Sequence, residues 1–231
     1  PVWFGATEAL FARYYRTDGM RIGTSTSAAS DERAQFDFNI SPRVTLGVVG
    51  QGGLGLRGQW WDYSHVEDAF VSATTATPPA QRFALDAYTV DLEIFEAFQM
   101  NSNWSVELSG GARHSGFKEQ MQDNAEMRLN RFNGVGPIVG IEGRRRFFNG
   151  QLYGRLQAAT LFGDKLRDNS SDPPLELSDT VHSQLEIAVG YRASRPLGDF
   201  GMLSWWGGVE ATEWLAVSSS FNQDGDVFQE D

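Results

Sequence analysis

The stretch VTLGVVGQGGLGLRGQWWDY at residues 44–63 predicts two β-strands joined by a tight glycine-rich turn at residues 50–53. Side chains alternate between apolar and polar or glycine along both halves. Leu54, Leu56 and Trp60 fall on one face of the second half, whereas Arg57 and Gln59 fall on the other. Period-two alternation is typical of a strand whose two faces meet different environments. This hairpin therefore predicts an all-β protein.

The rest of the chain repeats this hairpin unit. Further strand-like segments occupy about residues 3–15, 85–98, 104–113, 131–147, 151–162, 184–192 and 202–215. Short turns near residues 51, 101, 149 and 198 alternate with longer polar segments at residues 17–33, 65–82, 115–129 and 163–180. A regular order of short turn and long loop is typical of an up-and-down antiparallel meander. We expect nine strands in a single domain, 1–231.

Composition narrows the class of protein. The chain has no cysteine, so it holds no disulfide, and it has no run of eighteen apolar residues that would make a transmembrane helix. Its net charge of −11 argues against nucleic acid as a partner. Only Lys118 and Lys165 among the 19 basic residues are lysines. Because the arginine fork binds two carboxylate oxygens at once, this bias indicates that the polar strand face is enclosed.

Alternation alone does not say which face is outside, and two kinds of barrel fit it. A soluble ligand-binding barrel would turn its apolar face inward, whereas a transmembrane barrel turns it toward lipid. Balanced charges and many glycines on the polar face favour the transmembrane barrel. The side chains expected to line its lumen are Arg43, Arg57, Asp91, Glu93, Glu107, Arg113, Glu142, Arg144, Arg155, Glu186, Arg192 and Glu210. Trp60, Trp104 and Trp205 lie on the apolar face near the ends of the expected strands, as in an aromatic girdle.

Several short motifs occur in a fixed order along these strands. They are SPRVTLG at 41–47, GLGLRGQWW at 53–61, TVDLE at 89–93, LSGGAR at 108–113, GVGP at 134–137, EGRR at 142–145 and GVEA at 208–211. In this ordered set the chain resembles the pore-forming major outer-membrane protein family of Legionella and planctomycetes. The resemblance implies an antiparallel transmembrane β-barrel in the outer membrane of a Gram-negative bacterium. It implies no catalytic residue and no cofactor.

Two groups of residues allow other functions. His65, His114 and His182 all fall toward the long loops, where they could serve an outer-membrane enzyme or hold a metal, although no nucleophile and carboxylate accompany them. The segment NQDGD at 222–226 contains part of a calcium loop but lacks the glycine expected at its sixth position. We expect the three histidines to be solvated residues at the bases of the loops, we expect no metal at either place, and we interpret the inward charges as structural pairs.

The sequence therefore predicts a non-enzymatic outer-membrane barrel, either a small pore or a structural surface protein. Its partners would be outer-membrane lipid and a second copy or another surface protein. The triplet Arg144, Arg145 and Arg146 precedes a short turn, which is a suitable position for contacts with lipid headgroups.

Closure of the barrel raises one further expectation. Bacterial single-chain barrels have an even number of strands, and residues 218–231 do not resemble a lipid-facing strand. An unpaired strand edge in hydrocarbon leaves backbone groups without hydrogen bonds. We therefore expect a tenth strand from a continuation of the chain beyond Asp231, or else another chain or peptide that covers the edge.

Overall fold

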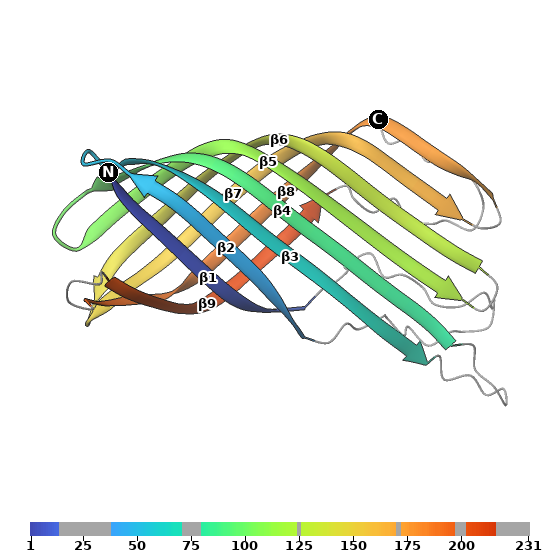
Figure 1. The fold of residues 1–231 in the computed structure, drawn as a ribbon, viewed down its shortest axis with the longest axis horizontal. Helices are drawn as coiled ribbons and strands as arrows, with labels where there is room; N and C mark the ends of the chain where they lie inside the picture. The colour runs from blue at the N-terminus through green and yellow to red at the C-terminus, as the bar shows by residue number, and fades with distance from the viewer. Residues whose placement is uncertain (14–37, 71–79, 124–125, 170–171, 197–201, 216–231) are drawn as a thin grey trace.

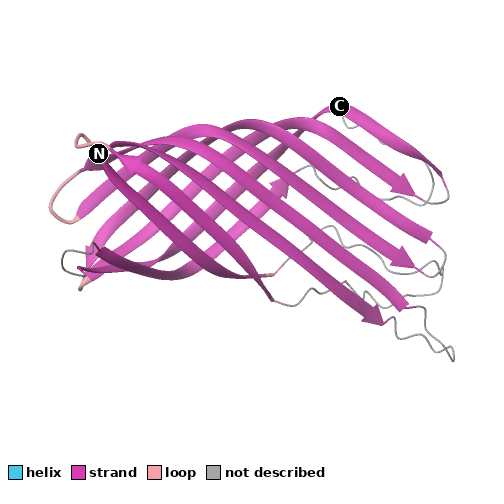
Figure 2. Cartoon of the chain, in the orientation of Figure 1, coloured by secondary structure: helices cyan, strands magenta, loops and turns pink. Residues whose placement is uncertain are grey.

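The computed structural model describes residues 1–13, 38–70, 80–123, 126–169, 172–196 and 202–215. These residues form nine strands and the turns between them (Figure 2). The strands are β1 (Val2–Ala12), β2 (Asn39–Val49), β3 (Leu54–Phe70), β4 (Ala80–Gln99), β5 (Trp104–Asp123), β6 (Glu126–Phe147), β7 (Gly150–Asn169), β8 (Asp172–Pro196) and β9 (Met202–Leu215). No helix among the described residues is long and apolar enough to cross a membrane.

Each strand pairs antiparallel with the strand that follows it in the sequence, in the order β1 to β9 (Figure 1). The tilted strands curl into a half-barrel, so the predicted up-and-down meander of nine strands is confirmed. Within the described ranges, β1 and β9 form the two edges of the sheet. The predicted tail at 218–231, the polar segment at 17–33 and the calcium-like segment at 222–226 lie outside the described residues.

Short turns join the strands at the end of the sheet that we call the short-turn end. In the first of these turns the amide of Gly53 donates to the carbonyl of Gly50 at 3.1 Å. The φ angle of Gly53 is 91°, a left-handed conformation that favours glycine. We call the opposite end of the sheet the long-loop end.

Three of the predicted long loops are wrong in their extent. β3 continues to Phe70, β5 and β6 remain paired as far as Asp123 and Glu126, and β7 and β8 pair through most of residues 163–180. Backbone hydrogen bonds need no particular side chain, so a ladder can continue where both faces become polar. Strand β1, in contrast, ends at Ala12, three residues before the predicted end at Tyr15.

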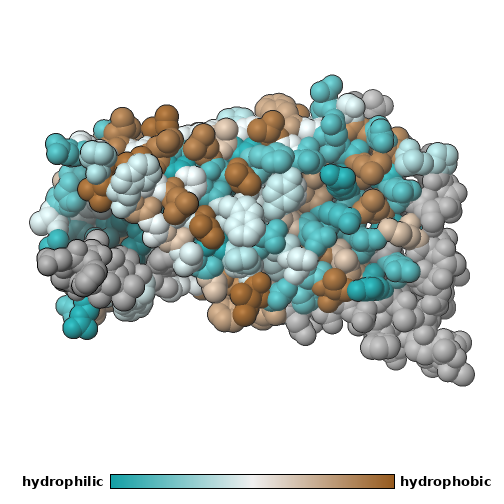
Figure 3. Space-filling model, viewed as in Figure 1, coloured by the Kyte–Doolittle hydropathy of each residue, from teal (hydrophilic) through white to brown (hydrophobic). Residues whose placement is uncertain are grey.

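Exposure alternates along the strands. Apolar side chains of the outer face are exposed, as the brown residues in Figure 3 illustrate, whereas their neighbours on the inner face are buried. On the outer face, Val106 and Leu185 are half-buried. The exposed ones include Leu54, Leu56, Val90, Leu92, Leu108, Val139, Ile141, Ile187 and Val189.

The outer face carries an apolar band with polar residues at its borders. On β6 it runs from Val135 to Ile141, between the exposed Arg131 and Arg145. On β5 it runs from Trp104 to Ala112, before His114. A tilted strand crosses the hydrocarbon core in about 9–11 residues, so the band on β5 matches the thickness of a bilayer and the band on β6 is somewhat shorter.

Candidate functional site

The charged side chains of the inner face form one connected region, which we call the ionic layer. Strand alternation turns every second residue inward, and the curvature of the sheet then brings side chains from distant strands together. The ionic layer comprises Glu8, Arg43, Arg57, Asp91, Glu93, Glu107, Arg113, Glu142, Arg144, Arg155, Glu186 and Glu210.

Arg113 is the most deeply buried arginine of the ionic layer, with 1 % of its surface exposed. Its Nε and Nη2 atoms donate to the two oxygens of Asp91, each at 2.7 Å. Its Nη1 atom donates to Glu186 Oε1 at 2.5 Å and to Gln184 Oε1 at 3.0 Å. Asp91 is the cross-strand neighbour of Arg113 on β4, whereas Gln184 and Glu186 lie on β8. Arg113 therefore links strands that are not adjacent in the sheet.

A second group of ion pairs lies nearer the short-turn end. Arg57 binds both oxygens of Glu93, at 3.2 and 3.1 Å, and reaches Glu107 Oε1 at 2.5 Å. Arg144 binds the other oxygen of Glu107 and also Glu142, each at 2.5 Å. Two arginines and three carboxylates thus alternate across β3 to β6, and no charge in the group lacks an opposite neighbour.

A third group of ion pairs connects the two edge regions of the sheet. Both terminal nitrogens of Arg43 on β2 donate to Glu210 on β9, one of them at 2.8 Å. Glu8 on β1 lies 3.4 Å from the same guanidinium, and Arg155 on β7 donates to Glu210 at 2.7 Å. Side chains therefore bridge β2 and β9 although the backbones of β1 and β9 do not pair within the described ranges.

Eleven of the twelve residues that the sequence predicted to face a lumen take part in these ion pairs. The twelfth, Arg192, places its guanidinium 5.9 Å from the ring centre of Tyr153.

Glycines on the inner face make room for two rings at the short-turn end. A Cβ atom at Gly47 would lie 2.4 Å from the ring of Phe4, and one at Gly55 would lie 2.3 Å from the ring of Phe95. The two rings meet edge to face with centres 6.0 Å apart. Phe95 also lies 5.2 Å from the guanidinium of Arg57, so it packs directly against the ionic layer.

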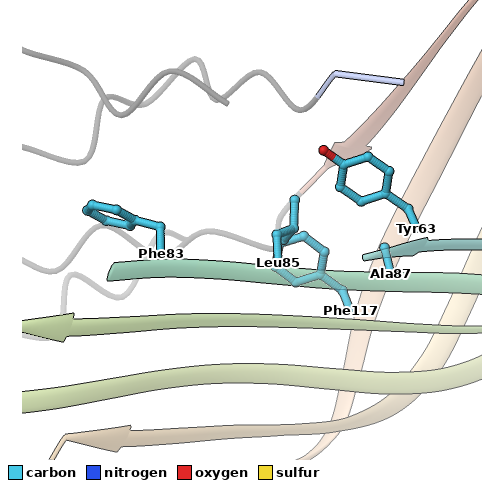
Figure 4. Close-up of a cluster of buried hydrophobic side chains, with 5 residues drawn as sticks. All are labelled: Tyr63, Phe83, Leu85, Ala87 and Phe117. Carbon is cyan, nitrogen blue, oxygen red and sulfur yellow. The ribbon is translucent and has the colours of Figure 1, made fainter. Parts of the chain in front are cut away.

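A second region of the inner face, which we call the aromatic layer, was not predicted from the sequence. It lies toward the long-loop end and contains two buried clusters, one of which is shown in Figure 4. The first cluster comprises Tyr63, Phe83, Leu85, Ala87 and Phe117, and the second comprises Phe132, Ile138, Ala159 and Leu161. The alternation of Asp91 and Glu93, extended backward along β4, assigns Leu85 and Phe83 to the inner face and would have revealed this layer.

Trp214 connects the two clusters of the aromatic layer. Its ring packs against both of them, and its centre lies 5.6 Å from that of Phe117. Ala12 and Trp61 pack against the first cluster as well. Side chains from β1, β3, β5, β6 and β9 therefore meet in the interior of the curled sheet.

The three histidines lie in strands and do not form one site. His182 is buried on the inner face with its ring 4.1 Å from that of Phe132, so the expectation of a solvated histidine is wrong there. His114 is exposed on the outer face, where its Nε2 atom lies 2.7 Å from Asn133 Oδ1. The ring of His65 lies 6.3 Å from that of Tyr63. Among the described residues, no group of three or more histidines and carboxylates could hold a metal ion.

The tryptophans predicted for a girdle are all exposed on the outer face. Trp104 begins β5 beside a short turn, and Trp205 lies near the start of β9. Trp60 lies well inside β3 because that strand is longer than expected. A girdle role for these three residues stays a prediction.

The family relationship follows from a comparison with known protein families. The family model described as Legionella pneumophila major outer membrane protein precursor matches residues 4–195, which extend from β1 into β8. The motif at 208–211 lies outside that match. No curated protein matches the chain. The match covers most of the chain and agrees with the antiparallel barrel-like sheet and its apolar outer face. The chain belongs to the Legionella major outer membrane protein family, and it is a protein of the bacterial outer membrane.

Proposed function

We propose that this protein is a non-enzymatic structural barrel of the outer membrane, a single domain whose interior is packed with side chains. The burial of the inner face carries this proposal. Arg113 is 1 % exposed, Gln157 2 % and Leu161 0 %, although all three project from the inner face of a single sheet. The lining of an open channel would instead be in contact with water.

The strand number supports the same conclusion. Eight strands already enclose an interior that side chains can fill, and nine or ten widen it only slightly. The long side chains of the ionic layer and the rings of the aromatic layer supply the volume needed to fill this interior. A wide, water-filled porin lumen is therefore not the function that this geometry favours.

A small pore is the second candidate, and one observation favours it. The side chains of Arg57, Arg144 and Arg155 are 16 %, 20 % and 16 % exposed, so part of the ionic layer is accessible to water. A rearrangement of the buried clusters of the aromatic layer would be needed for water to pass through the barrel.

The chemistry of the inner face gives no support to an enzyme. General acid–base catalysis needs a group that can exchange a proton with a bound substrate. The carboxylates of Asp91, Glu93 and Glu107 instead accept hydrogen bonds from arginines. We infer that these charges hold the strands together.

Ion conductance in planar bilayers tests the proposal. We expect the folded protein to insert without stable openings in salt solution. A double variant, Phe117→Ala with Trp214→Ala, should introduce measurable conductance because it removes two touching rings of the aromatic layer. Stable, large openings in the unmodified protein would contradict a packed interior and support the pore.

A further inference from the structure

The β6–β7 turn carries a group of basic and aromatic side chains that the packed interior does not use. We call it the short-turn patch, and it comprises Trp104, Arg145, Arg146, Phe147 and Phe148. All five residues are exposed. Trp104 and Arg145 are register partners on β5 and β6, and the guanidinium of Arg145 lies 5.5 Å from the ring centre of Trp104.

The turn itself displays a ring in an unusual way. Phe148 has a φ angle of 50°, a left-handed conformation more typical of glycine, and 84 % of its surface is exposed. Its ring meets that of Phe147 edge to face at 4.4 Å. A large apolar side chain is thus held outward at a position where a small residue would be less strained. Strained backbone of this kind is a reason to examine a segment for a function.

Arg145 differs from the arginines of the ionic layer in its partners. Its neighbour Arg144 faces inward and binds Glu107 and Glu142. Across the described strands, neither Arg145 nor Arg146 has a carboxylate within ion-pair distance. The protein has a net charge of −11, so carboxylates are abundant elsewhere in the chain. The charge of Arg145 is therefore available to an anion from outside the protein.

We propose that the short-turn patch binds the phosphate group of an anionic phospholipid. Short turns of outer-membrane barrels face the periplasm, so the patch would lie in the periplasmic leaflet. Trp104 occupies the level at which aromatic rings contact the headgroup region, and Arg145 at the end of the apolar band meets the phosphate there. Phe147 and Phe148 would anchor the turn among the upper parts of the acyl chains.

Native mass spectrometry of the folded protein with added lipid tests this site. Phosphatidylglycerol should remain bound in preference to zwitterionic phosphatidylethanolamine. Arg145→Gln removes the charge while keeping a long polar side chain, and we expect about a fivefold loss of phosphatidylglycerol affinity, as for one basic residue at a membrane surface. Arg131→Gln is the matched control, since Arg131 is exposed on the same strand beyond the other end of the apolar band. It should retain the affinity of the unmodified protein.

Two further variants separate binding from folding. Phe148→Gly should relieve the left-handed strain, leaving thermal stability equal or higher while weakening phosphatidylglycerol binding. Arg145→Lys keeps the charge and should retain most of the affinity. Equal binding of the two phospholipids, full binding by Arg145→Gln, or an equal loss in Arg131→Gln would overturn the proposal. Preferential binding of lipopolysaccharide by the patch would overturn it as well, because that lipid belongs to the other leaflet. None of these results depends on whether the interior conducts ions.

Discussion

The two layers of the inner face hold the same sheet together by different means. The ionic layer connects strands through arginine–carboxylate pairs, whereas the aromatic layer connects them through packed rings and aliphatic side chains. Arg113 on β5 reaches across to β8, and Phe117, four residues along the same strand, meets Trp214 on β9. The inward contacts of β5 therefore change from ionic to apolar over four residues.

The difference has an energetic consequence. A buried ion pair gains little over a well-packed apolar pair because both charges lose their hydration, but removal of one partner leaves the other charge buried without compensation. When an apolar side chain is shortened, the loss in the free energy of unfolding grows with the volume removed. We expect the ionic layer to fix which strands meet and the aromatic layer to exclude water.

The largest effect should come from the centre of the ionic layer. Arg113→Met leaves Asp91 and Glu186 buried without their cation, so we expect a loss of about 3–5 kcal/mol in the free energy of unfolding. Urea unfolding in lipid vesicles, followed by tryptophan fluorescence, measures this loss. The control Arg131→Met alters an exposed arginine and should change stability by under about 0.5 kcal/mol. Equal stabilities of the two variants would show that the ionic layer is not tightly packed.

Trp214→Ala should have the next largest effect. Because this ring contacts both clusters of the aromatic layer but is only half-buried, we expect a loss of about 2–4 kcal/mol. Trp205→Ala on the outer face removes the same side chain from a site without such packing and should cost less. A reversed order, with Trp205 the more important ring, would mean that lipid contacts outweigh the interior.

Glu142→Gln tests how much the charge of one carboxylate in the ionic layer contributes to stability. The amide can still accept a hydrogen bond from Arg144 but no longer carries a compensating charge, so we expect a loss of about 1–3 kcal/mol. Asp164→Asn is the matched control, because Asp164 is exposed near the long-loop end. The shift between folded and unfolded bands in heat-modifiability gels measures both variants. The same shift in both would contradict a structural role for the inner charges.

Glu8→Gln should have the smallest effect of the series. Glu8 approaches Arg43 only to 3.4 Å, and Arg43 keeps its two bonds to Glu210. We therefore expect a loss under about 1 kcal/mol in urea unfolding. A loss as large as that of Arg113→Met would show that β1 depends on this single contact for its place at the edge.

Much of the sheet and part of its inner face could be predicted from the sequence. Alternation assigned Arg57, Glu107 and Glu142 to one face because a strand has a fixed period of two. The partners across the interior could not be predicted in the same way. Arg43 meets Glu210 because the sheet is curved, and curvature depends on the twist of all nine strands rather than on a local pattern.

The aromatic layer was missed for a different reason. In the middle of β4 the apolar side chains face outward and Asp91 and Glu93 face inward. Nearer the long loops Phe83, Leu85 and Ala87 face inward while Arg82 and Asp86 face outward, so the apolar side chains change to the other face along one strand. The strand ends near the long loops raised another problem, since Lys118 and Glu119 made a paired strand resemble a polar loop.

Cysteine accessibility tests the packed interior most directly, because the native chain has no cysteine. Ser115→Cys and Ala159→Cys place a thiol at buried inner positions with little change in volume, and Asn149→Cys places one in an exposed short turn. In the folded protein in lipid vesicles, we predict that a charged, water-soluble thiol reagent modifies Asn149→Cys quickly and modifies the two inner thiols only after unfolding. Modification of Ser115→Cys and Ala159→Cys at the rate of Asn149→Cys would contradict the packed interior and indicate a water-filled lumen.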